Sequence, residues 1–358
     1  SVAGPGSIFW MWVTAIIGIA TKFFTCTLSV MYREKTKEGQ IFGGPMYVIK
    51  NGLPKRMLPL AYFFALAGMI GCLPAFQSNQ LIQITGDLAF SEIENFNIFG
   101  GLTLAGITGI VVIGGLKRIA EVATFLVPLM GSIYFGAMLI ALILNLDLVL
   151  PAFKLILVDA FNGTAVAGGT FFGVLIYGVR RGAFSNEAGM GTESLVHGVA
   201  KVSNPVKQGL VAMTGPIFDT LIICTATALM ILVSGVWETS SSQGVTLTAE
   251  AFSILLGNFG GLILFTCVIC FGLSTIFTYS YYGASCSRFL FGNFGMKFYI
   301  YLYIFSIFIY SIVPIDIAIN IADGAFALMA IPTLISALWL APKVMQASKN
   351  YFKLVDNI

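Results

Sequence analysis

Charged side chains are scarce in this sequence. Lys, Arg, Asp and Glu make up 10% of the 358 residues, whereas hydrophobic residues make up 58%. A soluble domain carries roughly a quarter charged residues, and one of this size has too little interior to hide so much apolar surface. The sequence shows no secretory signal peptide and no soluble domain. Because apolar runs of about twenty residues, the length that crosses a bilayer, recur from end to end, the composition predicts an all-α polytopic membrane protein.

Histidine is almost absent, and so are the motifs of the common energy-using enzymes. His197 is the only histidine, expected in a cytoplasmic loop, whereas haem, copper and zinc sites rely heavily on imidazole. The six cysteines fall in or at the ends of expected spans and are interpreted as small apolar residues. No Gly-rich phosphate loop is present. We therefore expect no enzymatic activity and no cofactor, and any pumping has to draw on an ion gradient.

The charges that are present divide between the two sides of the membrane. We predict nine spans, at approximately 8–31, 58–86, 99–116, 119–146, 164–200 (interrupted), 206–235, 259–286, 297–315 and 318–341. With these spans, nearly all Lys and Arg fall on one side and only Lys154 on the other, while Lys22 lies within a span. The positive-inside rule makes the first side cytoplasmic. The prediction is a multi-pass plasma-membrane protein with the N-terminus of this chain outside and its C-terminus in the cytoplasm.

One predicted span carries charges and glycines at its centre. The segment Gly178–Gly191 holds two arginines, a glutamate and four glycines within the span 164–200. Buried charge is costly in hydrocarbon, and irregular backbone at this depth is tolerated only where it lines a cavity. We expect a broken helix that binds the solute, with Ser185 as the N-cap of its second half. The alternative is a cytoplasmic loop, but the remaining stretch Thr164–Tyr177 is then too short to cross.

Other polar groups within spans leave alternatives open. The cluster Gln77-Ser78-Asn79-Gln80 is explained equally by hydrogen bonds between helices and by a solute site. Ser274 and Thr275 offer oxygen ligands for a hard cation, but paired hydroxyls in a helix more often bond to their own backbone. For Asp219 and Asp323 we favour structural ion pairing over ion binding. Pro216 is expected to kink the span 206–235.

These stretches, taken in order, resemble the alanine or glycine:cation symporter family, the sodium/alanine symporters. The stretches that carry the resemblance are Gly4-Pro5-Gly6, Gly43-Gly44-Pro45-Met46-Tyr47, Gln77-x-Asn79, Gly114-Gly115-Leu116-Lys117-Arg118, Arg181-Gly182-Ala183-Phe184-Ser185-Asn186-Glu187-Ala188-Gly189-Met190-Gly191, Pro205-Val206-Lys207-Gln208-Gly209, Asp219-Thr220-Leu221 and Tyr281-Tyr282-Gly283. They run over nearly the whole chain, and the Phe-Ser-Asn-Glu-Ala-Gly stretch is specific.

The resemblance implies a leucine-transporter-like inverted-repeat fold in a single transmembrane transporter domain, 1–358. Residues 1–146 would be the remainder of the first repeat, with four spans, and 164–341 the second repeat, with five; 342–358 would be a cytoplasmic tail. The chain opens with Ser1, outside and just before a span, and the family has a broken helix upstream of Gly4. We therefore expect the chain to be N-terminally truncated and to lack its first core helix.

The resemblance also implies site residues. The substrate-binding positions would be Gln77, Asn79, Gly178, Val179, Gly182, Phe184, Ser185, Asn186 and Tyr279, with Gly178–Phe184 unwound. Sodium would be the only metal, at Ser274 and Thr275. Ala284, Glu193, Ser194 and Thr333 depart from the family pattern, which puts substrate preference and stoichiometry in doubt.

The function implied is secondary active symport of a small neutral amino acid (alanine or glycine) with sodium by alternating access. A proton-coupled amino-acid transporter and a non-transporting receptor or scaffold remain alternatives. The expected partners are the amino acid, sodium and the lipid bilayer, without nucleic acid. The sequence leaves open which amino acid is carried and the oligomeric state.

Overall fold

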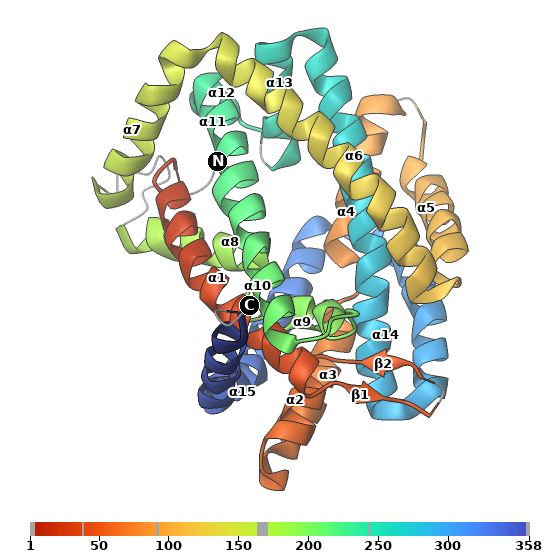
Figure 1. Cartoon of the computed structure of the whole chain (residues 1–358). Helices are drawn as coiled ribbons and strands as arrows, with labels where there is room; N and C mark the ends of the chain where they lie inside the picture. The colour runs from red at the N-terminus through yellow and green to blue at the C-terminus, as the bar shows by residue number, and fades with distance from the viewer. Residues whose placement is uncertain (1–3, 38, 91–92, 163–170, 243, 356–358) are drawn as a thin grey trace.

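Helices make up nearly all the regular structure of the chain (Figure 1). The computed structural model describes residues 4–37, 39–90, 93–162, 171–242 and 244–355. Its α-helices are α1 (Ser7–Met31), α2 (Pro45–Gly52), α3 (Leu58–Gly71), α4 (Ala75–Ala89), α5 (Phe96–Val112), α6 (Gly115–Leu144), α7 (Leu146–Asn162), α8 (Phe171–Asn186), α9 (Thr192–His197), α10 (Pro205–Pro216), α11 (Thr225–Val233), α12 (Val236–Thr239), α13 (Val245–Leu256), α14 (Asn258–Tyr310) and α15 (Ile315–Val355). A 3-10 turn η1 (Lys55–Met57), a π-helix η2 (Ile217–Cys224) and an antiparallel ribbon of β1 (Glu34–Lys35) and β2 (Ile41–Phe42) accompany them.

The longest helices have the length and composition of membrane spans. Among the described residues, six such segments occur: Ser7–Met31, Lys55–Gly86, Gly115–Leu144, Pro205–Val233, Phe259–Tyr310 and Asn320–Leu354. Many of their large apolar side chains are exposed, as Phe125 and Phe294 illustrate at 71% and 79%. Hydrocarbon is the solvent that tolerates such surfaces. The prediction of an all-α polytopic membrane protein is confirmed; the nine-span count and the inverted-repeat fold stay predictions.

Helix α14 is too long to be one span. Its 53 residues would reach about 80 Å at 1.5 Å per residue, against roughly 30 Å of hydrocarbon. At Gly292 the backbone leaves the helical region, with φ 68° and ψ −157°. Beyond that bend, Tyr303 donates a hydrogen bond of 2.7 Å to the carbonyl of Ile276 in the first half. The element therefore folds back on itself, as the two separate spans predicted for this region require.

Two helices organise the packing. Helix α14 contacts α3, α4, α5, α6 and α13, while α1 contacts α8 and α10, and α15 contacts both groups through α3, α4 and α1. The largest buried cluster lies among α3, α4, α14 and α15, and includes Phe64, Phe277, Tyr303 and Met329. Helices α7, α12 and α13 lie toward one end of the molecule, and the ribbon and α2 toward the other (Figure 1).

The helices differ in detail from the predicted spans in three places. The segment 147–163, predicted as a loop, forms helix α7 up to Asn162. The predicted span 58–86 is interrupted at Cys72–Pro74, where proline lacks the N–H that a helix needs. Much of the predicted tail is helical, because α15 continues to Val355 through Pro342.

Two further features of the chain concern glycine and proline. After Pro216 the helix does not simply bend but changes to the π form over Ile217–Cys224.

The glycine-rich loop before α2 packs onto the bundle, since the Gly44 amide donates to Ser29 Oγ at 2.7 Å. Ser29 in turn donates to the carbonyl of Ser194. The loop therefore joins α1 to the end of the segment that carries the predicted site.

Candidate functional site

The predicted helix interruption exists, but it is shorter and lies later than expected. Helix α8 runs without a break through Gly178 and Gly182 to Asn186, and α9 starts at Thr192. Between them Glu187, Gly189 and Gly191 have φ of 54°, 82° and 90°. The expectation that Gly178–Phe184 is unwound was wrong. Ser185 is not the N-cap of the second half either, because that position is taken by Gly191.

The glycines of α8 serve close packing against α1. A Cβ on Gly178 would lie 2.5 Å from the carbonyl oxygen of Ser7 and from Cβ of Trp10. A Cβ on Gly182 would lie 2.9 Å from Cβ of Thr14. Small residues four apart allow two helix backbones to approach in a membrane. Here these glycines set the distance between α8 and α1, while Val179 on the same helix is 40% exposed.

Glu187 is the central polar group of the interruption. One carboxylate oxygen accepts a hydrogen bond of 2.7 Å from the hydroxyl of Tyr279 on α14, and the other accepts one of 2.8 Å from Thr192 on α9. A left-handed conformation costs a non-glycine residue about 1–2 kcal/mol. A hydrogen bond to a charged group contributes about 1.5–3 kcal/mol. These two bonds therefore offset the strain and hold the turn.

A second carboxylate, Glu193, fastens α9 to α1. It is 4% exposed and accepts a hydrogen bond of 2.9 Å from Thr25 on α1 and one of 3.2 Å from the backbone amide of Gly191. The ammonium group of Lys22 on α1 also acts on it electrostatically. A buried carboxylate needs partners of this kind. Glu193 therefore joins α9 and the turn before it to α1.

The remaining predicted residues of α8 face different neighbours. Ser185 donates a hydrogen bond of 2.5 Å to Asp219 on η2. Asn186 is 2% exposed and accepts from the amide of Ala188 at 3.0 Å, while its Nδ2 has no hydrogen-bond partner among the described residues. A Cβ on Gly18 of α1 would lie 3.1 Å from that nitrogen. The end of α8 thus presents one buried amide donor toward α1.

The amide cluster of α4 begins directly after the first interruption in the chain, Cys72–Pro74. Asn79 donates from Nδ2 to the carbonyls of Tyr310 and Val313, at 3.2 and 2.6 Å, and so ties α4 to the end of α14. Gln77 is half-buried and makes no hydrogen bond within the described part of the chain. The two predicted amides therefore differ: the Asn79 side chain is held by α14, and the Gln77 side chain is not hydrogen-bonded to any described residue.

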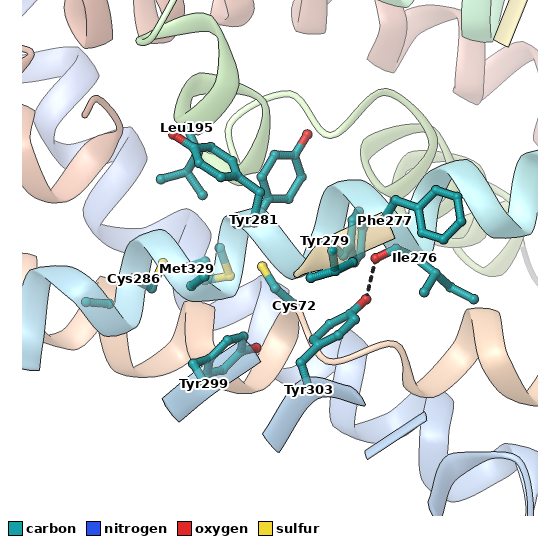
Figure 2. Close-up of a cluster of buried hydrophobic side chains, with 14 of the residues drawn as sticks. Cys72, Leu195, Ile276, Phe277, Tyr279, Tyr281, Cys286, Tyr299, Tyr303 and Met329 are labelled. Atoms are coloured by element: carbon teal, nitrogen blue, oxygen red, sulfur yellow. Dashed lines mark hydrogen bonds between the residues drawn. The ribbon is translucent and has the colours of Figure 1, made fainter. Parts of the chain in front are cut away.

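Aromatic rings connect the two interruptions. Phe184 lies 6.4 Å, ring centre to ring centre, from Phe76 on α4 and 5.7 Å from Phe326 on α15. Tyr279 lies 6.1 Å from Phe326. Figure 2 shows Tyr279 and Cys72, the latter at the first interruption, in the same buried cluster. Phe184 and Tyr279 therefore share the neighbour Phe326, and Phe184 also contacts the start of α4.

The predicted ion ligands lie on α14, slightly more than one turn before Tyr279. Ser274 and Thr275 both donate to the carbonyl of Phe271, at 2.9 Å. This is the back-bonding expected of hydroxyls within a helix. A hydroxyl that donates in this way keeps its lone pairs, so both oxygens remain able to ligate a cation.

The partners of the acidic residues within the spans were predicted only in part. Asp323 pairs with Arg180, which confirms structural pairing for this carboxylate. Asp219 instead accepts from Ser185 and, at 3.0 Å, from Thr220. The bond between Glu187 and Tyr279 was not predicted, because nothing in their spacing indicates that residues 92 positions apart meet.

Comparisons with known proteins agree on one family. The sequence profile of the sodium:alanine symporter family matches residues 1–357. The chain is 36% identical to the sodium/alanine symporter AgcS of Methanococcus maripaludis, with 99% of this chain and 79% of that protein covered. It is 37% identical to the uncharacterized transporter YflA of Bacillus subtilis, covering 98% and 74%. It is 34% identical to the probable sodium/glutamine symporter GlnT of the same organism, covering 98% and 73%.

Proposed function

The chain belongs to the sodium:alanine symporter family, and on that premise we propose that it carries a small neutral amino acid across the plasma membrane together with sodium. The observation that carries the proposal is the interruption Glu187–Gly191, fixed to α14 by the bond between Glu187 and Tyr279. Transporters commonly bind their substrates where helices are broken near the middle of the membrane. We take alanine as the first substrate to test, because a relative is named for it.

In this proposal the substrate's ammonium group lies at the C-terminal end of α8. The last carbonyls of a helix lack partners within it, and the helix dipole makes that end negative. The Glu187 carboxylate stands directly beyond. Phe184 and Tyr279 would enclose the small side chain, and Gln77 would supply the free amide. Asn79, Gly178, Val179, Gly182, Ser185 and Asn186 stay in the proposal as the residues that shape the surrounding helices.

Coupling would follow from a shared element. Ser274 and Thr275, proposed to ligate sodium, lie on the same helix as Tyr279, which holds the interruption. Sodium that orders this part of α14 would stabilise the substrate site, and substrate would strengthen sodium binding by the same factor. Alternating access then requires the two ligands to bind and leave together.

The test is uptake of radiolabelled alanine, with glutamine as the second substrate, into proteoliposomes that contain the full gene product. An inward sodium gradient should drive accumulation, and replacing sodium with potassium should abolish it. In the same assay, Gln77→Ala should lower uptake about ten-fold or more, equivalent to roughly 1.4 kcal/mol. The control is Gln83→Ala, which changes an exposed amide of the same helix. Accumulation driven by a proton gradient without sodium would refute the sodium coupling.

A further inference from the structure

A pocket lies between the β-ribbon, α2, α3 and α14, away from the proposed transport site. Its volume is about 320 Å³, and it is open to the surroundings. Four elements of the fold line it, mostly with basic and aromatic side chains: Lys35, Phe42, Tyr47, Lys50, Tyr62, Arg288 and Phe289, accompanied by Glu34, Thr36 and Leu58. We call it the basic pocket. Further basic residues, Lys37, Lys55 and Arg56, are close in sequence to residues that line this pocket.

The charges of the basic pocket do not cancel. Glu34 is its one acidic residue, and it is paired with Lys50 at 2.8 Å. Arg288 stacks over the ring of Phe42, 3.5 Å from its centre, and donates to Gln40 at 3.3 Å. Neither Arg288 nor Lys35 forms a salt bridge with any described carboxylate. Two cations from separate elements are therefore available to one anion.

The geometry around Arg288 is fixed by packing. Phe289, the next residue, contacts Tyr47 and Tyr62 with ring centres 5.4 and 5.7 Å away. A guanidinium held flat against a ring presents its N–H fork in a defined direction, which suits phosphate oxygens. Of the cations in the pocket, Arg288 is therefore the one whose position is fixed by packing.

An apolar stripe leads away from this pocket along α3. Tyr62 lines the pocket, and Leu66 and Ile70 follow at intervals of four residues, which places all three on one face of the helix. Their exposed fractions are 46%, 52% and 53%. Within a membrane such a face contacts lipid chains. The cations that suit a phosphate group therefore lie next to an apolar face that suits acyl chains.

We propose that the basic pocket binds the phosphate headgroup of an anionic phospholipid, whose acyl chains lie along Tyr62, Leu66 and Ile70. A basic pocket between helices at the membrane surface is the expected recognition site for anionic headgroups. A free phosphate shares the headgroup chemistry but makes no use of the stripe. The bound lipid would stabilise the position of the β-ribbon relative to α3 and α14.

The test is native mass spectrometry of the full gene product in neutral detergent, titrated with dioleoylphosphatidylglycerol or dioleoylphosphatidylcholine. Each cation that lies against the bound headgroup strengthens binding by about five-fold. Lys35→Gln, an exposed change that spares the fold, should weaken phosphatidylglycerol binding about five-fold. Lys35→Gln combined with Arg288→Gln should weaken it about 25-fold. The control pair, Lys117→Gln with Lys349→Gln, removes two exposed charges elsewhere and should leave binding unchanged.

Three outcomes would overturn the proposal. The double variant could bind phosphatidylglycerol as tightly as the unmodified protein. Phosphatidylcholine could bind equally well. Inorganic phosphate or glycerol 3-phosphate at millimolar concentration could displace the lipid completely, which would assign the pocket to a soluble anion.

Discussion

The interruption between α3 and α4 and the interruption between α8 and α9 reach the same buried cluster by different means. At Cys72–Pro74 no described residue has a positive φ, and the broken ladder is repaired locally: Ser78 donates to the Pro74 carbonyl from its amide and its hydroxyl, at 2.9 and 2.5 Å. At Glu187–Gly191 three residues adopt positive φ, and the turn is held by side chains of α1, α9 and α14. The first is a local device, whereas the second depends on tertiary contacts.

This difference predicts which interruption responds to its surroundings. A locally repaired break keeps its shape when neighbouring helices move. A break held by Tyr279 and Thr25 must change when α14 or α1 moves. We therefore expect conformational coupling at the second interruption and a fixed frame at the first, and three substitutions test this contrast.

The largest effect is expected for Gly191→Ala. Gly191 has φ 90°, and a Cβ there would lie 2.6 Å from Pro45 Cγ, 2.6 Å from Thr333 Oγ1 and 2.8 Å from Phe64 Cε2. Strain and overpacking together should cost about 3 kcal/mol or more, seen as a large fall in the thermal unfolding midpoint in detergent. Gly173→Ala in α8, where a Cβ meets no atom within 4 Å, is the matched control. It should be neutral or slightly stabilising; equal losses in both variants would contradict the account.

A smaller effect is expected for Tyr279→Phe, which removes the hydroxyl that holds Glu187. The loss of a bond to a carboxylate should cost about 1.5–3 kcal/mol, and alanine uptake should fall with it. Tyr303→Phe removes an equally buried hydroxyl of the same helix that donates to a neutral carbonyl. It should cost about 1 kcal/mol and leave uptake intact. Unfolding midpoints and uptake rates measured side by side check the pair; loss of uptake in both variants would show that the carboxylate bond is not special.

The smallest effect is expected for Pro74→Ala. The carbonyl that Ser78 uses remains, and the new N–H can extend α4 backward. The change in unfolding free energy should stay below about 1 kcal/mol in either direction, as measured by the same thermal assay. A loss as large as that of Gly191→Ala would mean that the first interruption also depends on tertiary contacts.

The sequence predicted the class of fold better than the local backbone conformation of the segment Gly178–Gly191. Hydropathy indicated the long apolar helices, and Phe184 and Tyr279 share the neighbour Phe326. Glycines in Gly178–Gly191 indicated unwinding, yet Gly178 and Gly182 serve helix packing against α1. A glycine needed for close approach and one needed for positive φ look the same in a sequence. The partners of Glu187 and Glu193 lie far along the chain, on helices whose rotation only the packed structure fixes.

The π-helix η2 has a consequence for register. Each extra residue in a helical turn rotates everything beyond it by about 100° relative to a continuous α-helix. Within η2, Asp219 accepts a hydrogen bond from Ser185 of α8. Directly after η2, the hydroxyl of Thr225 accepts a hydrogen bond of 2.7 Å from the indole N–H of Trp12 on α1. This stretch therefore contacts α8 at the π segment and contacts α1 through α10, η2 and Thr225. The rotation introduced by η2 therefore helps to determine which side chains of this stretch face α8 and which face α1.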